Sequence, residues 1–124
     1  MVQLAFQNTA DFDTNIRRVI PYYDEIYCQV LDLIRTVCGK RPIAALDTGC
    51  GTGNYAVQAT GVLDFSRLVL CDPSEEMLEL AQKKTLPACC ELRRIGSEQL
   101  DYDRQFDVVT AIQSHHYLDR KSVV

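Results

Sequence analysis

Long apolar runs are missing from this sequence: no segment approaches the roughly 18 residues that a membrane-spanning helix needs. Residues 1–10 lack the charged start and the apolar core of a secretory signal, so we expect a cytoplasmic protein. The six cysteines include no C-x-x-C pair, which argues against a zinc site and against a disulfide framework. We therefore expect reduced thiols and no bound metal.

Basic charge is also limited. The 13 lysines and arginines are outnumbered by 17 acidic residues, and several of them come as scattered pairs. The net charge of −4 argues against a large nucleic-acid footprint, although a single pair could still contact RNA. The 124 residues are enough for one domain with one core, and an apolar content of 47% is ordinary for a globular protein.

The most informative stretch is rich in glycine. Residues 46–53 read Leu-Asp-Thr-Gly-Cys-Gly-Thr-Gly, after an apolar run at 43–46 and before a helix-compatible run at 54–59. This order predicts a strand, a glycine turn and a short helix over residues 54–60, with Gly61 at its end. Glycine lets the backbone approach a ligand closely, and a helix N-terminus presents free N–H groups. The stretch therefore indicates a nucleotide-type ligand site on an α/β sheet, with a purely structural tight turn as the alternative.

The glycine spacing bears on which ligand is bound. Gly49, Gly51 and Gly53 form G-x-G-x-G, and Asn54 stands where the dinucleotide fingerprint G-x-G-x-x-G has its third glycine. Asp47, two residues before the first glycine, would repel a pyrophosphate but would suit an ammonium group. S-adenosylmethionine has an adenosine end, no phosphate, a sulfonium and a free amino acid end. We therefore favour it over NAD.

The segment 47–53 resembles motif I of the class I S-adenosylmethionine-dependent methyltransferases, and the segments up to about residue 118 follow that family in order and spacing. The resemblance implies an α/β fold with a Rossmann-like parallel sheet, strand order 3-2-1-4 and flanking helices. It implies S-adenosylmethionine as cofactor and S-adenosylhomocysteine as product. It also implies that the turn and the acid before it bind the methionine end, through Asp47, Gly49, Cys50, Gly51 and Gly53.

A second acid follows the second predicted strand, residues 67–71. Asp72 comes 23 residues after Gly49, a distance that fits an acid accepting hydrogen bonds from ribose hydroxyls. The family has an acid at this point, so the resemblance assigns the ribose to Asp72. It places Pro73, Ser74 and Met77 against the adenine, although a methionine here is as often part of the core.

Ser74 has the sequence features of a helix N-cap. Glu75 and Glu76 would lie in the first turn of this helix, and Lys83 and Lys84 in its last turn.

The third predicted strand, residues 90–95, leads into a departure from the family pattern. Ser97 stands where the family usually has an aspartate that accepts a hydrogen bond from the adenine amino group. A serine hydroxyl can accept that bond without charge, and the backbone N–H of Glu98 can still donate to a ring nitrogen of the adenine. Adenine recognition is therefore expected at Ser97 and Glu98.

The fourth predicted strand, residues 106–112, resembles motif IV, with Asp107 at its usual place. Ala111 would line the methionine end. His115 and His116 follow at the carboxyl end of the strand, where open α/β sheets bind ligands. They are weak candidates for proton transfer, because histidines here often have only a structural part in the family.

Residues 14–38 have apolar positions at helical spacing, and Pro21 interrupts them, which predicts two helices meeting near residues 20–22. By the resemblance, residues 1–42 form a helical lid segment and residues 43–124 form the cofactor-binding domain. The segment around Pro21 is also similar to carboxy-S-adenosylmethionine synthases, in which the position of Tyr23 touches the ligand. Packing at a helix junction is the alternative for Tyr23.

The resemblance also implies an incomplete fold, since a class I methyltransferase continues with further helices and three more strands. Strand four would then be an unpaired apolar edge, which proteins avoid. We expect a fragment of a larger enzyme, a homodimer that completes the sheet across strand four, or a stand-alone binding module.

The leading interpretation is an S-adenosylmethionine-dependent methyltransferase whose methyl acceptor the sequence does not identify. The resemblance implies no fixed catalytic residue, because much of the catalysis can come from holding nucleophile and methyl group in line. The alternatives are an S-adenosylmethionine-binding module without turnover, a carboxy-S-adenosylmethionine synthase-like enzyme and an NAD-dependent oxidoreductase.

Overall fold

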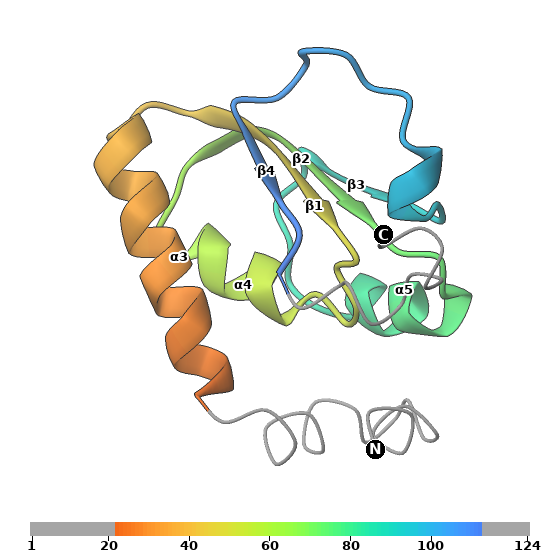
Figure 1. Ribbon diagram of the computed structural model, residues 1–124. Helices are drawn as coiled ribbons and strands as arrows, with labels where there is room; N and C mark the ends of the chain where they lie inside the picture. Colours follow the sequence, from red (N-terminus) through yellow and green to blue (C-terminus); the bar gives the residue numbers. More distant parts are fainter. Residues whose placement is uncertain (1–21, 113–124) are drawn as a thin grey trace.

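A four-stranded parallel sheet organises the described part of the chain. This computed structural model describes residues 22–112, apart from the side chains of Tyr23 and Ser97. The sheet has the order β3-β2-β1-β4, and every neighbouring pair is parallel (Figure 1). The predicted order 3-2-1-4 is therefore confirmed. The strands are β1 (Ile43–Thr48), β2 (Phe65–Cys71), β3 (Cys90–Arg93) and β4 (Val108–Thr110).

The strand boundaries differ from the predicted ones because of how each strand pairs. β1 runs beyond residue 46, since it pairs with β2 as far as Thr48 opposite Cys71. Asp47 therefore lies inside β1 instead of following it. β3 and β4 are shorter than the predicted ranges 90–95 and 106–112, since each is an edge strand of the described sheet and pairs on one side only.

Among the described residues, α3 (Tyr23–Cys38) precedes β1, and the strands are connected by α4 (Asn54–Thr60), α5 (Glu75–Gln82) and the 3-10 turn η2 (Ser97–Gln99). The start of α3 agrees with the second of the two helices predicted to meet near residues 20–22, because Tyr22 has a φ of 60°, outside the right-handed helical region. The first of these helices lies outside the described residues. The helix predicted over 54–60, with Gly61 at its end, is confirmed. The helix after Ser74 ends at Gln82, so the prediction that two lysines form its last turn is wrong.

The three helices pack on one face of the sheet. Leu68 and Leu70 of β2 pack with Ala56 of α4. Tyr27 of α3 meets Tyr55 of α4 edge to face, with ring centroids 5.5 Å apart. α3 thus shares a core cluster with the sheet domain, while its expected action as a lid stays a prediction.

Within residues 22–112, the opposite face of the sheet is covered by the segment that links β3 to β4, which includes η2 but no α-helix. Leu46, Val69 and Cys71 are buried there under partly buried side chains between residues 95 and 106. Arg67 lies over the rings of Tyr102 and Phe106, at 5.7 and 5.2 Å from their centroids. Figure 1 shows this segment, coloured blue, passing from β3 through η2 and a long loop to β4.

Candidate ligand site

The glycine turn lies at the carboxyl ends of β1 and β2, beside β4. β1 and β2 are consecutive strands, whereas β4 pairs with the other side of β1, so the chain direction across the sheet reverses here. Open α/β sheets bind ligands at such a switch point. The amide of Cys50 donates to the carbonyl oxygen of Cys71 (2.9 Å), which holds the turn against the end of β2.

Three glycines of the turn have positive φ angles: 66° at Gly49, 58° at Gly51 and 85° at Gly53. Residues with a side chain rarely adopt this region, so the glycines set the path of the turn. Gly53 also lies close to α5, because a Cβ placed on it would be 3.4 Å from the Cβ of Ala81. A Cβ placed on Gly51 would meet no atom within 4 Å, although the residue itself is buried. The turn therefore borders an open space at Gly51.

Asp72 joins the glycine turn to the segment after β2. Its side chain is fully buried, and its two oxygens accept from the amides of Gly51 (2.9 Å) and Ser74 (2.8 Å). Burial raises the pKa of this carboxyl, and the two amide bonds lower it in part. Each carboxylate oxygen has two lone pairs, so each retains capacity for another donor. Asp72 can therefore accept from a diol while it shapes the turn.

Asp47 is the second buried carboxyl, with an exposed fraction of 4%. Burial raises its pKa from 3.8 to about 7; a hydrogen bond from Thr110 lowers it, and the charge of Asp72 raises it. None of the ion pairs among the described residues involves either carboxyl. The site is therefore negative when both groups are ionised, which favours a cationic ligand group over a phosphate.

Thr110 of β4 lies directly opposite Asp47 in the β1–β4 register. Its hydroxyl donates to Oδ1 of Asp47 at 2.6 Å, and its carbonyl oxygen accepts from the hydroxyl of Thr48 at 3.2 Å. A hydrogen bond with Thr110 also affects the buried hydroxyl of Tyr55, whose pKa is raised chiefly by burial. The sequence analysis missed Thr110, although it lies in the segment that resembles motif IV; a threonine at the end of a strand beside the glycine turn was the available signal.

Lys84 also acts on the turn, and the sequence analysis missed it. Its ammonium donates to the carbonyl oxygen of Thr52 and to Oδ1 of Asn54, both at 2.9 Å. Lys84 is partly buried, whereas Lys83 beside it is exposed. Only contacts made in the fold reveal this difference, since the two residues are adjacent in the sequence.

The other predicted site residues are more dispersed. Ser74 caps α5, with its hydroxyl accepting from the amide of Met77 at 3.3 Å. Met77 is 2% exposed in the cluster with Tyr27, so it lies in the core. Pro73, Glu98 and Ala111 are exposed, the side chains of Tyr23 and Ser97 are not described, and His115 and His116 lie outside the described residues.

Asp107, at the place expected from motif IV, joins β4 to β1. Its Oδ2 accepts from the amide of Ala44 at 2.9 Å, and its own amide donates to the carbonyl oxygen of Ala44 at 2.7 Å. Arg41 lies 3.6 Å from its other carboxylate oxygen. These contacts stabilise the start of β4 and do not involve the glycine turn.

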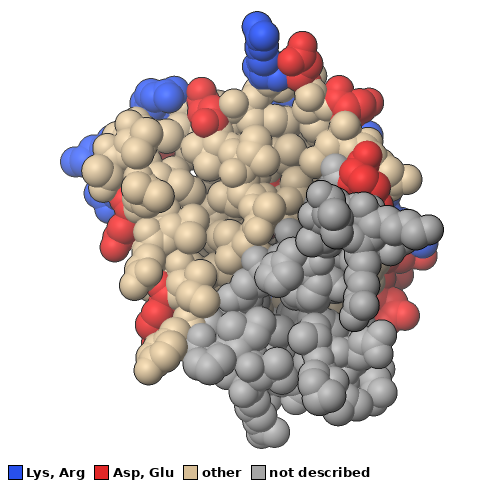
Figure 2. All heavy atoms as spheres, in the orientation of Figure 1, with Lys and Arg blue, Asp and Glu red and all other residues tan. Residues whose placement is uncertain are grey.

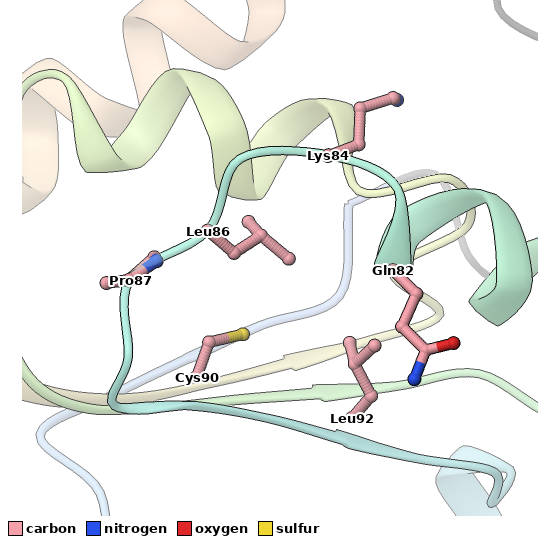
Figure 3. Close-up of a pocket in the computed structure, with 6 residues that line it drawn as sticks. All are labelled: Gln82, Lys84, Leu86, Pro87, Cys90 and Leu92. Carbon is pink, nitrogen blue, oxygen red and sulfur yellow. The ribbon is translucent and has the colours of Figure 1, made fainter.

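The remaining described surfaces give less support for a functional site than the glycine turn does. Within residues 22–112 no group of three or more His, Cys, Asp or Glu could hold a metal ion, and no helix is long and apolar enough to cross a membrane. On the face in Figure 2, the described basic and acidic side chains both lie around the rim of the molecule. A cavity of about 360 Å³ beside β3 (Figure 3) contains none of the predicted site residues; it is lined by Gln82, Lys84, Leu86, Pro87, Cys90 and Leu92.

A family model described as a methyltransferase domain matches residues 45–124, which include the glycine turn and all four strands apart from the first two residues of β1. The chain belongs to this methyltransferase-domain family. The resemblance to class I S-adenosylmethionine-dependent methyltransferases is thereby confirmed, and it is favoured over the oxidoreductase alternative.

Relatives of this methyltransferase domain include the cypemycin N-terminal methyltransferase of a Streptomyces species. It is 30% identical over 112 residues, which cover 77% of this chain and 44% of the relative. Among solved structures, the N-methyltransferase NodS of Bradyrhizobium japonicum, in complex with S-adenosylhomocysteine, has a TM-score of 0.67 at 18% identity. That match covers 86% of this chain and 53% of NodS.

The magnesium protoporphyrin IX methyltransferase of Synechocystis, with bound S-adenosylmethionine, has a TM-score of 0.65 at 16% identity, over 79% of this chain and 48% of that one. At these identities the two structures show a shared fold. The methyltransferase domain described here spans about half the length of these relatives.

Proposed function

We propose that this chain supplies the S-adenosylmethionine-binding part of a methyltransferase. The observation that carries the proposal is the pairing of two buried carboxyls, Asp47 and Asp72, on either side of a glycine turn that borders open space at Gly51. Family membership supports the same function.

The charge of the site supports this ligand over a dinucleotide. A pyrophosphate would bring two negative charges to a site that already holds Asp47 and Asp72. S-adenosylmethionine would bring a positive ammonium and a positive sulfonium, and charges of opposite sign attract strongly where burial limits screening by water. The ligand supplies a methyl group already activated by the sulfonium. The chain's own residues would bind it, orient it and exclude water.

We assign each of the two carboxyls, and the backbone of the glycine turn, to one part of the ligand. Asp47 and the backbone of Gly49, Cys50, Gly51 and Gly53 would bind the amino acid end. Asp72 would accept from the ribose hydroxyls, because its two oxygens retain lone pairs.

The adenine side of the proposed site is made of residues near α5 and η2: Pro73, Ser74, Ser97 and the backbone of Glu98. Met77 would contact the adenine from the side of the hydrophobic core. Ala111, just after β4, and Tyr23, at the start of α3, would contact the ligand, and His115 and His116 remain weak candidates for proton transfer.

An amine is the acceptor that we propose to test first. The names of two relatives, the cypemycin N-terminal methyltransferase and the N-methyltransferase NodS, both indicate a nitrogen acceptor. A neutral amine has the lone pair that in-line attack on the methyl group requires. The test is transfer of labelled methyl from S-adenosylmethionine to a pool of peptides with free N-termini, with N-acetylated peptides as the matched control. Labelling of both pools alike would contradict an N-terminal acceptor.

Ligand binding is tested separately from turnover, since a binding module would bind without transferring methyl. Calorimetric titration with S-adenosylhomocysteine should give saturable heat, and titration with NAD should not. Binding of NAD with equal or higher affinity would contradict the proposal. Binding of S-adenosylhomocysteine without methyl transfer to any acceptor would favour the binding-module alternative.

We also propose that two copies pair across β4. β4 forms an edge of the described sheet, and Val109 at its centre is 61% exposed. Apolar edge strands tend to pair with another chain. The mass in solution tests this: a dimer that Val109→Lys converts to a monomer supports pairing across β4, and an unchanged mass contradicts it.

A further inference from the structure

The contact between β4 and β1 at the end of the sheet does more than join two strands. Thr110 and Asp47 are register partners, and the threonine hydroxyl donates to the carboxylate at 2.6 Å. A bond this short to an ionised acceptor is at the strong end of hydrogen bonds. The described residues therefore give Asp47 a charge-assisted donor on the neighbouring strand.

Two further contacts with β1 hold Thr110 in place. Its carbonyl oxygen accepts from the hydroxyl of Thr48 at 3.2 Å, and its hydroxyl is also 3.5 Å from the carbonyl oxygen of Leu46. Both Thr48 and Leu46 belong to β1. The branched side chain of Thr110 has few staggered states, so its donor direction is restricted. The hydroxyl is thus aimed at Asp47 before any ligand binds.

We infer that Thr110 is a positioning residue that keeps the Asp47 carboxylate ionised and oriented for the ammonium group of S-adenosylmethionine. This inference rests on the proposed function, since it names how one carboxyl of that site is prepared. Thr110 acts through Asp47 and is assigned no contact with the reacting atoms.

Asp47 needs a hydrogen-bond donor to stay ionised, because its carboxyl is buried. Removal from water disfavours the charged form of a carboxyl, and the buried Asp47 has no ion pair among the described residues. Among the described residues, the ionisable groups that interact with Asp47 are acids or weak acids: Asp72 after β2, Cys71 in β2, Cys50 in the glycine turn and Tyr55 in α4. None of these four groups provides positive charge, so a neutral hydroxyl donor is what opposes protonation.

The inference predicts a pH-dependent defect. Thr110→Val keeps the β-branched shape and removes the hydroxyl, so more of Asp47 should be protonated near neutral pH. The affinity for S-adenosylhomocysteine at pH 7 should fall by roughly threefold to tenfold, the effect of one charge-assisted hydrogen bond. The defect should shrink at pH 8.5, where Asp47 is ionised in both proteins. Thr110→Ser keeps the donor and should restore the affinity at pH 7.

The experiment is calorimetric titration of the full chain with S-adenosylhomocysteine at pH 6, 7 and 8.5 for wild type, Thr110→Val and Thr110→Ser. Carboxyl carbon NMR of Asp47 without ligand gives an independent reading, with a higher pKa in Thr110→Val and an unchanged one in Thr110→Ser. Equal affinities of wild type and Thr110→Val, or a defect of the same size at every pH, would overturn the inference. If the NMR shift appears but wild type binds no S-adenosylhomocysteine, the proposed function fails while the coupling between Thr110 and Asp47 stands.

Discussion

Asp47 should lower the stability of the ligand-free chain at neutral pH. The folded state raises its pKa from 3.8 to about 7, so the folded chain binds a proton more tightly than the unfolded chain between these values. The stabilising effect of that proton is complete below pH 3.8 and is lost as the pH rises to about 7. Asp47→Asn removes the ionisation and keeps an oxygen that accepts from Thr110. The variant should therefore be more stable than wild type at neutral pH.

The magnitude follows from the difference between the pKa of Asp47 in the folded and unfolded states. A difference of one pKa unit corresponds to about 1.4 kcal/mol, so the raised pKa of Asp47 lowers the stability of the folded chain by about 4 kcal/mol at pH 7.5 but only by about 2 kcal/mol at pH 5. The stability advantage of Asp47→Asn should accordingly grow by about 2 kcal/mol between pH 5 and pH 7.5.

Urea denaturation of wild type and Asp47→Asn, followed by circular dichroism at both pH values, measures this growth. Asp103→Asn is the matched control, because the Asp103 side chain is 92% exposed and the substitution should change little at either pH. An advantage of the same size at pH 5 and pH 7.5 would refute the reasoning, because it would show that burial does not penalise the charge of Asp47. Under the proposed function the same variant should bind S-adenosylhomocysteine at least tenfold more weakly.

Two further predictions concern the backbone of the turn. Gly51→Ala should cost about 1–2 kcal/mol of stability because its φ is 58°, and it should abolish ligand binding because the new methyl enters the open space. Gly39→Ala, also at a positive φ with open space around it, should lose stability but retain binding in the same titration; loss of binding in both would contradict a specific role for Gly51. Lys84→Met should lose about 1–3 kcal/mol in thermal unfolding and bind ligand several-fold more weakly, whereas Lys83→Met should change neither. Equal effects of the two lysine variants would show that the bonds of Lys84 to the turn do not matter.

The sequence predicted the parts of the fold that depend on local chemistry. The glycine spacing predicted the turn, and Gly61 and Ser74 predicted helix boundaries that the structure confirms. The parallel order 3-2-1-4 came from the family resemblance, not from periodicity. The strand lengths were predicted less well, because a strand ends where its neighbour stops pairing, as at Thr110 in β4.

The candidate site was predicted in outline but not in its supporting contacts. Asp47 and Asp72 were identified from their places after the predicted strands, and the structure brings both to the glycine turn. Thr110 and Lys84 were missed because their partners lie 63 and 32 residues away in the chain. Such contacts follow from strand pairing and helix packing, which short motifs do not encode.

The central claim is that Asp72 and the glycine turn form an S-adenosylmethionine site. Calorimetric titration of the full chain with S-adenosylhomocysteine tests it most directly, with Asp72→Asn and the exposed control Asp103→Asn beside wild type. The account predicts saturable binding by wild type and Asp103→Asn, and at least tenfold weaker binding by Asp72→Asn, which can no longer accept on both sides of its side chain. A folded wild-type chain that binds no S-adenosylhomocysteine, or an Asp72→Asn variant that binds as tightly as wild type, would contradict the account.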